Sequence, residues 1–331
     1  MVKQEEKNKR REIKKRPTLA EIAKVEAAVL KGARRFFEQE RYTEVVTLHL
    51  TRATGSCENV ATMFGLDYFG DNAYLVQTGQ LYLESLIPDL GKVACVGPSF
   101  RAEPKVDDRH LTEFTLAEIE FPVSKPGRMG EFLDEIEGLV NMMVTEGIKE
   151  VEKLYPGFGD FGHKEALQGP YARITYEEAI DMLSDYGVKF YDDLKADHEA
   201  HIVRQTGKPT FITHYPLAIK FFNMRRNNAD PRVVNSADLI LPYSGEAVGA
   251  AEREFEYESL TKRLKQSPML KQLEERGGSI EDFRWYLDEI KERGVPHAGC
   301  GVGVNRVTQA VLGVSDIRKT TPYAQNRKTL L

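Results

Sequence analysis

Two short segments of the chain carry cationic, acidic and aromatic residues at close spacing. In the first, Arg101 and Glu103 stand two residues apart and are followed by Arg109, His110 and Phe114. Guanidinium groups bind phosphate oxygens through paired hydrogen bonds, and an aromatic ring can stack on a purine base. The set therefore suits a nucleoside triphosphate such as ATP. It equally suits a salt-bridged surface hairpin around a core phenylalanine, so this segment alone leaves both interpretations open.

The second segment alternates glycine with small residues and ends in a cation. Gly299, Gly301 and Gly303 stand two residues apart, and Arg306 follows them. Because glycine lets the backbone approach another group closely, the stretch could form one wall of a nucleotide site or pack a strand against a helix. The spacing lacks a complete GxGxxG pattern, and no acidic residue follows at the distance expected in a βαβ unit. These features exclude a dinucleotide-binding fold.

The helices that must hold these residues have clear start signals. Thr18 and Glu21 form a capping box before an apolar pattern of helical period, which predicts a helix to about residue 40. The same period runs through residues 129–154. Two further capping boxes predict helices that end near residues 182 and 290, and they begin at Thr175 with Glu178 and at Ser279 with Asp282.

The strands are short and grouped. Residues 114–121 alternate imperfectly between apolar and polar side chains after a charged stretch at 104–109, which predicts a hairpin with a charged tip. β-Rich runs predict three more strands, at residues 45–50, 73–76 and 93–96. Strands and helices come in blocks rather than in regular alternation. The sequence therefore predicts an α+β fold, with an antiparallel sheet flanked by helices, in one domain over residues 18–331.

The composition indicates a globular protein. Hydrophobic residues make up 41% and charged residues 29% of the chain, values typical of a globular protein. No apolar run of about 18 residues and no apolar leader is present, so we expect a cytoplasmic protein without a membrane partner. Three dispersed cysteines form no metal-binding or disulfide pattern.

Charge is uneven along the chain. The net charge of −5 gives no general case for binding nucleic acid. Residues 1–17 are an exception, because eight lysines and arginines there oppose three glutamates. This basic N-terminal arm could contact phosphates, or it could be a solvated, frayed terminus.

Together, the two segments resemble motifs 2 and 3 of the class II aminoacyl-tRNA synthetases. Arg101-Ala102-Glu103, then Arg109-His110-Leu111 and Glu113-Phe114, are similar to the FRAE, RHL and EF elements of the asparaginyl and aspartyl branch. The resemblance extends from about residue 20 to residue 327 and implies a class II catalytic domain. It also implies ATP-binding and catalytic roles: the α-phosphate for Arg101, the adenine region for Glu103, the outer phosphates for Arg109 and His110, adenine stacking for Phe114, and the γ-phosphate side for Arg306.

The resemblance also implies a magnesium site. Asp238 and Glu246 flank an apolar run at the positions where this branch holds the ion. Carboxylates suit a hard cation that bridges ATP oxygens, so the chemistry agrees, although two acids at strand ends would look the same. Glu120, on the returning strand of the hairpin, is expected to add to this acidic wall.

An amino-acid pocket follows from the same resemblance. Glu58 matches the glutamate that receives the substrate ammonium group, and Gln80 lies in the segment beneath the substrate. Leu83 and Glu84 stand where aspartyl enzymes carry a lysine that reads the side-chain carboxylate. A buried Glu84 would accept a carboxamide NH₂ and repel a carboxylate, which favours asparagine; an ordinary helix-surface acid is the alternative. Arg253 is expected to contact the amide oxygen or carboxylate, and residues 214–220 resemble a further pocket segment.

Three departures from the branch change the expectation. The expected domains include no anticodon-binding domain ahead of the catalytic segments. Because that domain recognises tRNA in this branch, tRNA is not the favoured acceptor. Leu48 replaces a proline at the dimer contact of motif 1, and a homodimer is still expected. Asn305 replaces the acidic residue that commonly precedes the motif 3 arginine.

The resemblance implies an ATP-dependent, adenylate-forming ligase that activates aspartate or asparagine. Residues 252–257 look like those of archaeal asparagine synthetases related to asparaginyl-tRNA synthetase, so a small amine, ammonia above all, is the favoured acceptor. Two alternatives stay open: a truncated asparagine–tRNA ligase that charges tRNA, and a non-catalytic paralogue that senses ATP or asparagine.

Overall fold

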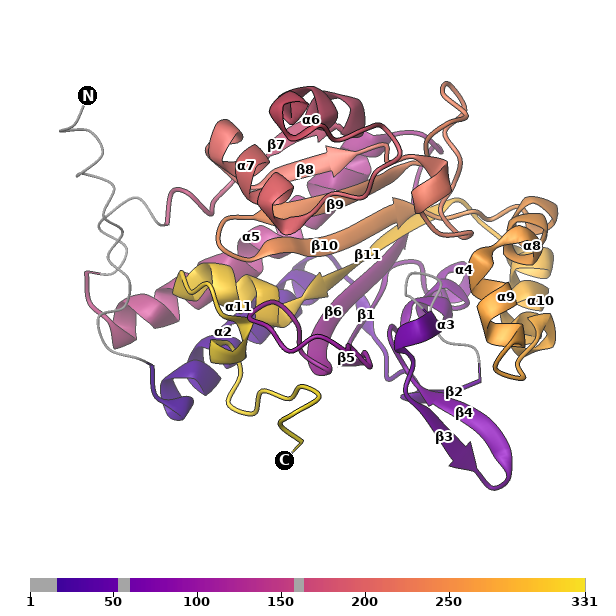
Figure 1. Cartoon of the computed structure of the whole chain (residues 1–331), viewed down its shortest axis with the longest axis horizontal. Coiled ribbons are helices and arrows are strands. Elements are labelled where there is room, and N and C mark those ends of the chain that lie inside the picture. The colour runs from indigo at the N-terminus through magenta and orange to yellow at the C-terminus, as the bar shows by residue number, and fades with distance from the viewer. Residues whose placement is uncertain (1–16, 53–59, 158–163, 331) are drawn as a thin grey trace.

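The computed structural model describes residues 17–52, 60–157 and 164–330, and its centre is a large mixed sheet (Figure 1). The strands of this sheet are β1 Thr43–Glu44, β5 Val93–Phe100, β6 Glu113–Pro122, β7 Ala172–Thr175, β8 Thr210–Thr213, β9 Ser236–Leu241, β10 Gly245–Glu252 and β11 His297–Gly303. They lie in the order β1-β5-β6-β11-β10-β9-β8-β7. The six central strands are antiparallel, while β1 pairs with β5 and β7 with β8 in parallel. The predicted α+β class is confirmed.

The helices follow the predicted start signals closely. Thr18 caps α2 and Thr175 caps α6, each through a complete capping box with a glutamate three residues on. The predicted helix at 129–154 is α5, with those bounds. The helices are α2 Leu19–Gln39, α3 Gln80–Glu84, α4 Ile87–Leu90, α5 Met129–Leu154, α6 Tyr176–Met182, α7 Ala196–Thr206, α8 Tyr257–Gln266, α9 Pro268–Glu274, α10 Arg284–Arg293 and α11 Val304–Leu312.

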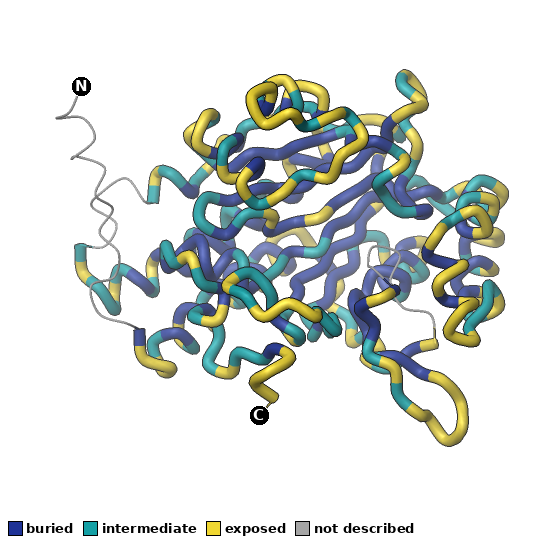
Figure 2. The backbone as a smooth tube through the Cα atoms, viewed as in Figure 1, coloured by how far each residue is buried: buried dark blue, intermediate teal, exposed yellow. Residues whose placement is uncertain are grey.

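One face of the sheet is covered by α2, α5 and α11, which form the main core. Figure 1 shows α2 and α5 running behind the central strands, and Figure 2 shows the buried residues following those strands. Successive strand residues point to opposite faces, so Ala117, Ile119 and Phe121 of β6 pack on the helices. The intervening Glu118 and Glu120 face the other side. This alternation leaves one face of the sheet for polar chemistry.

Close approach of α2 and α5 depends on Gly32. A Cβ atom at this position would lie 2.5 Å from the Cα of Met143 and 2.6 Å from the carbonyl oxygen of Met142. Both are backbone atoms, which cannot rotate away. The two longest helices therefore pack at a distance that only glycine permits here.

Smaller layers border the polar face. A second sheet, of order β2-β4-β3, contains β2 Leu50–Thr51, β3 Gly65–Tyr68 and β4 Asp71–Leu75, and its β3–β4 hairpin projects from the body (Figure 1). Helices α8, α9 and α10 form a separate cluster that packs on α3 and on the 3₁₀ turn Val60–Thr62. Among the described helices none is long and apolar enough to cross a membrane.

Two predictions of elements were wrong in detail. Of the strand expected at 45–50, only Leu50 is in a strand, because β1 ends at Glu44 and β2 begins at Leu50. Val46 and Leu48 face away from the core and are 100% and 63% exposed. Ser279 and Asp282 do form a capping box, but the turn they cap, Ile280–Phe283, is a 3₁₀ helix, and the α-helix begins at Arg284.

Candidate active site

A cavity of about 340 Å³ opens over the polar face of the sheet and brings the two predicted segments together. Its lining joins β6, β9, β10, β11 and the first turn of α11. Segments separated by about two hundred residues in sequence therefore share one site. Among the predicted residues, the lining includes Arg101, Glu103, Arg109, His110, Phe114, Asp238, Glu246, Arg253 and Arg306.

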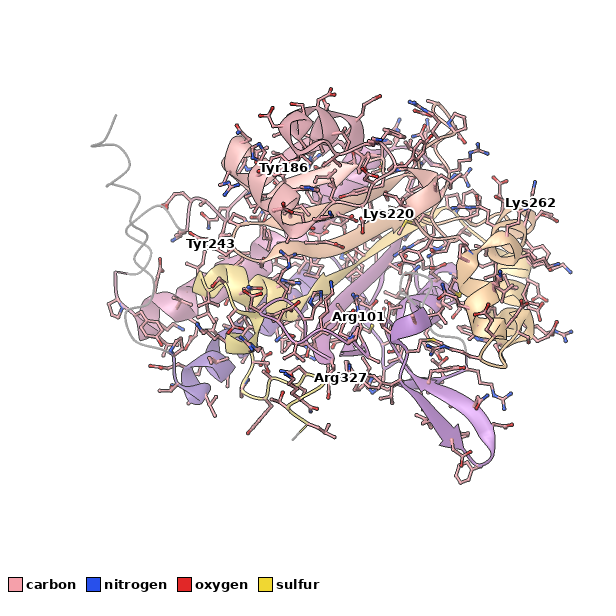
Figure 3. The ribbon with its side chains drawn as sticks, viewed as in Figure 1. Arg101, Tyr186, Lys220, Tyr243, Lys262 and Arg327 are labelled. Carbon is pink, nitrogen blue, oxygen red and sulfur yellow. The ribbon has the colours of Figure 1, made fainter. Side chains whose placement is uncertain are left out.

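Arg101 and Phe114 form one end of this site. Arg101 follows β5 and Phe114 lies near the start of β6, so the hairpin register places them side by side. The guanidinium carbon of Arg101 lies 5.0 Å from the centre of the Phe114 ring. Figure 3 shows Arg101 below Lys220, which follows the 3₁₀ turn Leu217–Ile219 between β8 and β9. A planar cation and an aromatic face at this spacing can hold a phosphate and a base.

Arg306 approaches the same cavity from the first turn of α11. Its guanidinium donates to the carbonyl oxygens of Ser244, at 2.7 Å, and Arg109, at 2.8 Å. Burial, followed by repulsion from Arg109, lowers the pKa of Arg306 to about 10. Both carbonyl acceptors are neutral, so this half-buried charge favours the arrival of an anion.

Arg109 is held by a residue that the sequence did not single out. Its Nη2 atom donates to Oε2 of Glu199 at 3.2 Å, and Glu199 comes from α7, which belongs to another layer. Glu199 is only 6% exposed, and burial raises its pKa despite the charge of Arg109. A single glutamate inside a helix carries no sequence motif, which is why it was missed. Nearby, Nδ1 of His110 lies 2.8 Å from Asp107.

The two acids expected to bind magnesium lie on adjacent strands. Asp238 is on β9 and Glu246 on β10, and Nζ of Lys220 lies 2.6 Å from Oδ2 of Asp238. Burial, and then the charge of Asp238, raises the pKa of Glu246 to about 8. Asp238 is buried while Glu246 is exposed toward the cavity, and two carboxylates on adjacent strands suit a hard divalent cation. Lys220, from the predicted pocket segment 214–220, balances the negative charge of Asp238.

Glu120 and Arg253 form the floor on the other side. Nη2 of Arg253 donates to Oε1 of Glu120 at 2.6 Å and Nε donates to it at 3.0 Å. The Glu120 carboxylate sits over Gly299, where an added Cβ would lie 2.0 Å from its carboxyl carbon. Gly299 therefore makes room for a side chain of the adjacent strand β6, a role different from the two predicted for this glycine stretch. Glu118 points to the same face and accepts from the amide of Gly79 at 2.7 Å and from the hydroxyl of Thr78.

Gln80 and Glu84 take a different place from the one expected. Neither belongs to the described residues that line the cavity. Their side chains are buried behind Arg253, where Nε2 of Gln80 donates to Oε1 of Glu84 at 2.5 Å. The expectation that Glu84 contacts the substrate directly needs correction, because its oxygens are already occupied. Glu58 falls in residues 53–59, outside the described ranges.

Asn305 explains one departure from the branch pattern. Its side-chain oxygen accepts from the amide of Thr115 at 3.2 Å, and its Nδ2 donates to Oε1 of Glu26 in α2 at 3.2 Å. Burial raises the pKa of Glu26. An acidic residue at 305 would place a second carboxyl group beside Glu26, so the neutral amide suits this site.

Comparisons with known proteins agree with this geometry. The family model described as tRNA synthetases class II (D, K and N) matches residues 3–327. An asparagine–tRNA ligase of Pelotomaculum thermopropionicum is 36% identical over 313 residues, covering 93% of this chain and 69% of the relative. Its counterpart in Pyrococcus abyssi is 37% identical over 311 residues, covering 93% and 68%.

Solved structures give the same result. The crystal structure of asparaginyl-tRNA synthetase from Pyrococcus horikoshii complexed with asparaginyl-adenylate matches with a TM-score of 0.82 at 35% identity. The match covers 94% of this chain and 70% of that one. The asparaginyl-tRNA synthetase of Entamoeba histolytica, in complex with the same adenylate, matches with a TM-score of 0.80 at 27% identity, covering 94% and 68%. The chain therefore belongs to the class II tRNA synthetases, in their asparaginyl and aspartyl branch, and is an ATP-dependent, adenylate-forming ligase.

Proposed function

We propose that this chain activates asparagine with ATP to form asparaginyl-adenylate and then transfers the asparaginyl group to tRNA. One observation carries the proposal. A single cavity places three arginines suited to phosphates, Arg101, Arg109 and Arg306, within reach of Arg253, and Leu83 stands where a carboxylate-reading lysine would be expected. The relatives' names support asparagine as the amino acid.

In the first step, an oxygen of the asparagine α-carboxylate attacks the α-phosphorus of ATP. The new P–O bond forms as the bond to the β-phosphate oxygen breaks, and diphosphate leaves. Arg101 would stabilise charge at the α-phosphate, Phe114 would hold adenine, and Arg109 and Arg306 would bind the outer phosphates. Asp238 and Glu246 would hold Mg²⁺, which neutralises phosphate charge when bound.

The amino-acid side chain would meet Arg253 at the other end of the cavity. Arg253 can donate to the carboxamide oxygen, while its charge is already balanced by Glu120. A carboxylate would gain little there, because no unpaired cation awaits it among the described residues of this wall. Asparagine is therefore preferred to aspartate.

In the second step, the proposed acceptor of the asparaginyl group is tRNA. The relatives found are named asparagine–tRNA ligases, so they support tRNA rather than the ammonia first favoured from sequence. The hydroxyl of the tRNA terminal ribose would attack the adenylate carbonyl carbon, and AMP would leave. Ammonia as acceptor would instead yield free asparagine from a β-aspartyl-adenylate.

Two measurements test this function. ATP–diphosphate isotope exchange should depend on asparagine and much less on aspartate. Incubation with ATP, magnesium, asparagine and tRNA should then give asparaginyl-tRNA and AMP, whereas aspartate with ammonia should give no asparagine. Exchange with asparagine but product only from aspartate and ammonia would overturn the tRNA acceptor, and no exchange with either amino acid would overturn the activation step.

A further inference from the structure

Behind Arg253 lies a buried cluster of ionisable side chains from four different elements. Glu84 comes from α3, Glu120 from β6, Tyr286 from α10 and His297 from β11. None of these residues, nor Arg253 itself, is more than 2% exposed. One ligating atom from each of Glu84, Glu120 and His297 lies within 4.8 Å of the others.

This cluster does not suit a metal ion. The guanidinium of Arg253 already fills the position of a cation, with Nη2 at 2.6 Å from Glu120 and Nε at 3.9 Å from Glu84. Oε2 of Glu84 also accepts from the hydroxyl of Tyr286 at 2.6 Å. The carboxylates are therefore satisfied by donors of the protein.

The ring of His297 has an oxygen at each nitrogen. Nδ1 lies 2.7 Å from the carbonyl oxygen of Val295, and Nε2 lies 3.1 Å from Oε2 of Glu84. A carbonyl oxygen can only accept, so Nδ1 must carry a proton. The hydroxyl proton of Tyr286 is donated to Oε2 of Glu84 and cannot also serve the contact between that oxygen and Nε2 of His297. A further proton must therefore lie between Nε2 and Glu84. Geometry alone thus requires one proton more than a neutral imidazole and a carboxylate together hold.

The electrostatics agree with that proton count. Burial opposes the charged form of His297, but the hydrogen bond and charge of Glu84 outweigh it and raise the pKa of His297. Burial likewise opposes ionisation of Glu84, yet His297 and then Arg253 lower the pKa of Glu84. The pair is accordingly an imidazolium and a carboxylate. Arg253 with Glu120 forms a second such pair, and the buried cluster carries no net charge.

We propose that His297 sets how strongly the pocket discriminates between asparagine and aspartate. By cancelling the charge of Glu84 it holds the cluster at zero net charge, whereas the cluster without this imidazolium would be negative and would reject a carboxylate more strongly. This inference rests on the proposed function. With both pairs closed, Arg253 offers hydrogen bonds to a substrate carboxamide but no surplus charge to a substrate carboxylate. Burying an aspartate side chain against Glu120 would then place an uncompensated anion in the interior, which is costly.

The net charge of this cluster predicts how the selectivity for asparagine over aspartate responds to pH. Among the described residues, the charged or titratable groups around His297 are Glu84, Glu120, Arg253 and Tyr286. Burial raises the pKa of Glu120 to about 7. Below that pH the cluster gains a proton and positive charge, so the preference for asparagine over aspartate should fall. Above the raised pKa of His297 the cluster turns negative, and the preference should rise.

Charge-changing variants provide the test, with the ratio of kcat/KM for asparagine to that for aspartate in isotope exchange as the readout. Glu120→Gln is isosteric and leaves the cluster positive, so the ratio should fall by about tenfold or more. His297→Gln keeps a donor toward Glu84 and leaves the cluster negative, so the ratio should rise. The double variant is neutral again and should return toward the wild-type ratio. Equal losses for both amino acids, with an unchanged ratio in every variant, would overturn the inference and leave His297 a structural residue.

A second measurement is independent of activity. The chain has seven histidines, so ¹⁵N-histidine NMR of the substrate-free protein is tractable, and the His297 signals are those lost in His297→Gln. Both ring nitrogens should be protonated at pH 7.5. A neutral ring would overturn the proposed proton even if the enzyme is active. Conversely, a wild-type protein that exchanges with neither amino acid fails the proposed function, while the NMR result still decides the charge of His297.

Discussion

Arg306 illustrates how a half-buried cation can be positioned for a ligand. Its hydrogen-bond partners at Ser244 and Arg109 are carbonyl oxygens from two different loops, so the arginine also joins those loops to α11. A phosphate would supply the negative charge that these neutral acceptors lack. Arg306 is therefore both a ligand-binding group and a link between the segments of the site.

Replacing Arg306 by alanine should reduce asparagine-dependent isotope exchange by about 10²- to 10³-fold, the usual effect of removing one preorganised donor to developing charge. Arg306→Lys should lose nearly as much, because lysine has one nitrogen where two guanidinium nitrogens contact the two carbonyl oxygens. Arg284→Ala is a matched control, since Arg284 is an exposed arginine of α10. Activity unchanged in Arg306→Ala would exclude Arg306 from the phosphate site.

Glu199 offers a second test at the scale of one residue. Glu199→Gln should loosen Arg109 and raise KM for ATP by about tenfold, because a hydrogen bond between charged groups is weakened. KM for asparagine should change little. Asp197→Asn, an exposed carboxylate on the same helix, serves as control. An equal rise in both KM values would show that Glu199 supports the whole fold rather than Arg109.

Sequence reasoning reached the residues that occur in motifs but not those that act through tertiary contacts. Arg101, Phe114 and Arg306 were found because order and spacing along the chain identify them. Glu199 was missed because its meaning comes from Arg109, ninety residues away in sequence. Glu84 was identified as important but placed in the wrong layer, since spacing cannot show that His297 and Tyr286 occupy its oxygens.

At the scale of elements, local signals were the reliable ones. The capping boxes at Thr18 and Thr175 set the helix starts because they act within four residues. The strand predicted at 45–50 failed because Val46 and Leu48 are exposed and have no partner strand among the described residues, and strand preference depends on packing. The parallel pairing of β1 with β5 could not be predicted, since it joins residues about fifty positions apart.

The packing of α2 on α5 gives a prediction about stability. Gly32→Ala places a methyl group against the backbone of Met143 and should lower the free energy of unfolding by about 1–3 kcal/mol. Gly130→Ala, in α5 with open space at its Cβ position, should leave stability unchanged or slightly higher. Denaturant midpoints of the two variants make the comparison. Equal midpoints would show that the helices can separate without cost.

At the scale of the whole molecule, one sheet edge carries exposed apolar residues. Val46 and Leu48 follow β1 and are 100% and 63% exposed. We expect this edge to be the homodimer contact implied by motif 1, so that the double variant Val46→Asp/Leu48→Asp is monomeric in sedimentation. Tyr191→Asp, an exposed residue in the layer beside the opposite edge, should remain dimeric. A wild-type monomer would contradict the expectation directly.

The basic arm, residues 1–17, gives a prediction about the acceptor. Removing residues 1–16 should lower kcat/KM for tRNA and weaken its salt dependence, because fewer phosphates are neutralised. Asparagine-dependent isotope exchange should be unaffected, since that step involves no tRNA. Loss of exchange as well would show that the arm supports the catalytic domain, and unchanged charging would show that it does not bind tRNA.

The alternation of glycine along β11 has a practical consequence. At Gly299 a side chain would strike Glu120, but at Gly301 an added Cβ would meet Glu118 and Leu116 at 3.7 and 3.9 Å, which is ordinary contact. Alanine at 301 would therefore disturb the empty protein very little while reducing the room left for a ligand. Substitutions at 301 would therefore reduce the volume available to a ligand without disturbing the fold. A variant of this kind could bind a smaller substrate analogue and exclude the natural substrate.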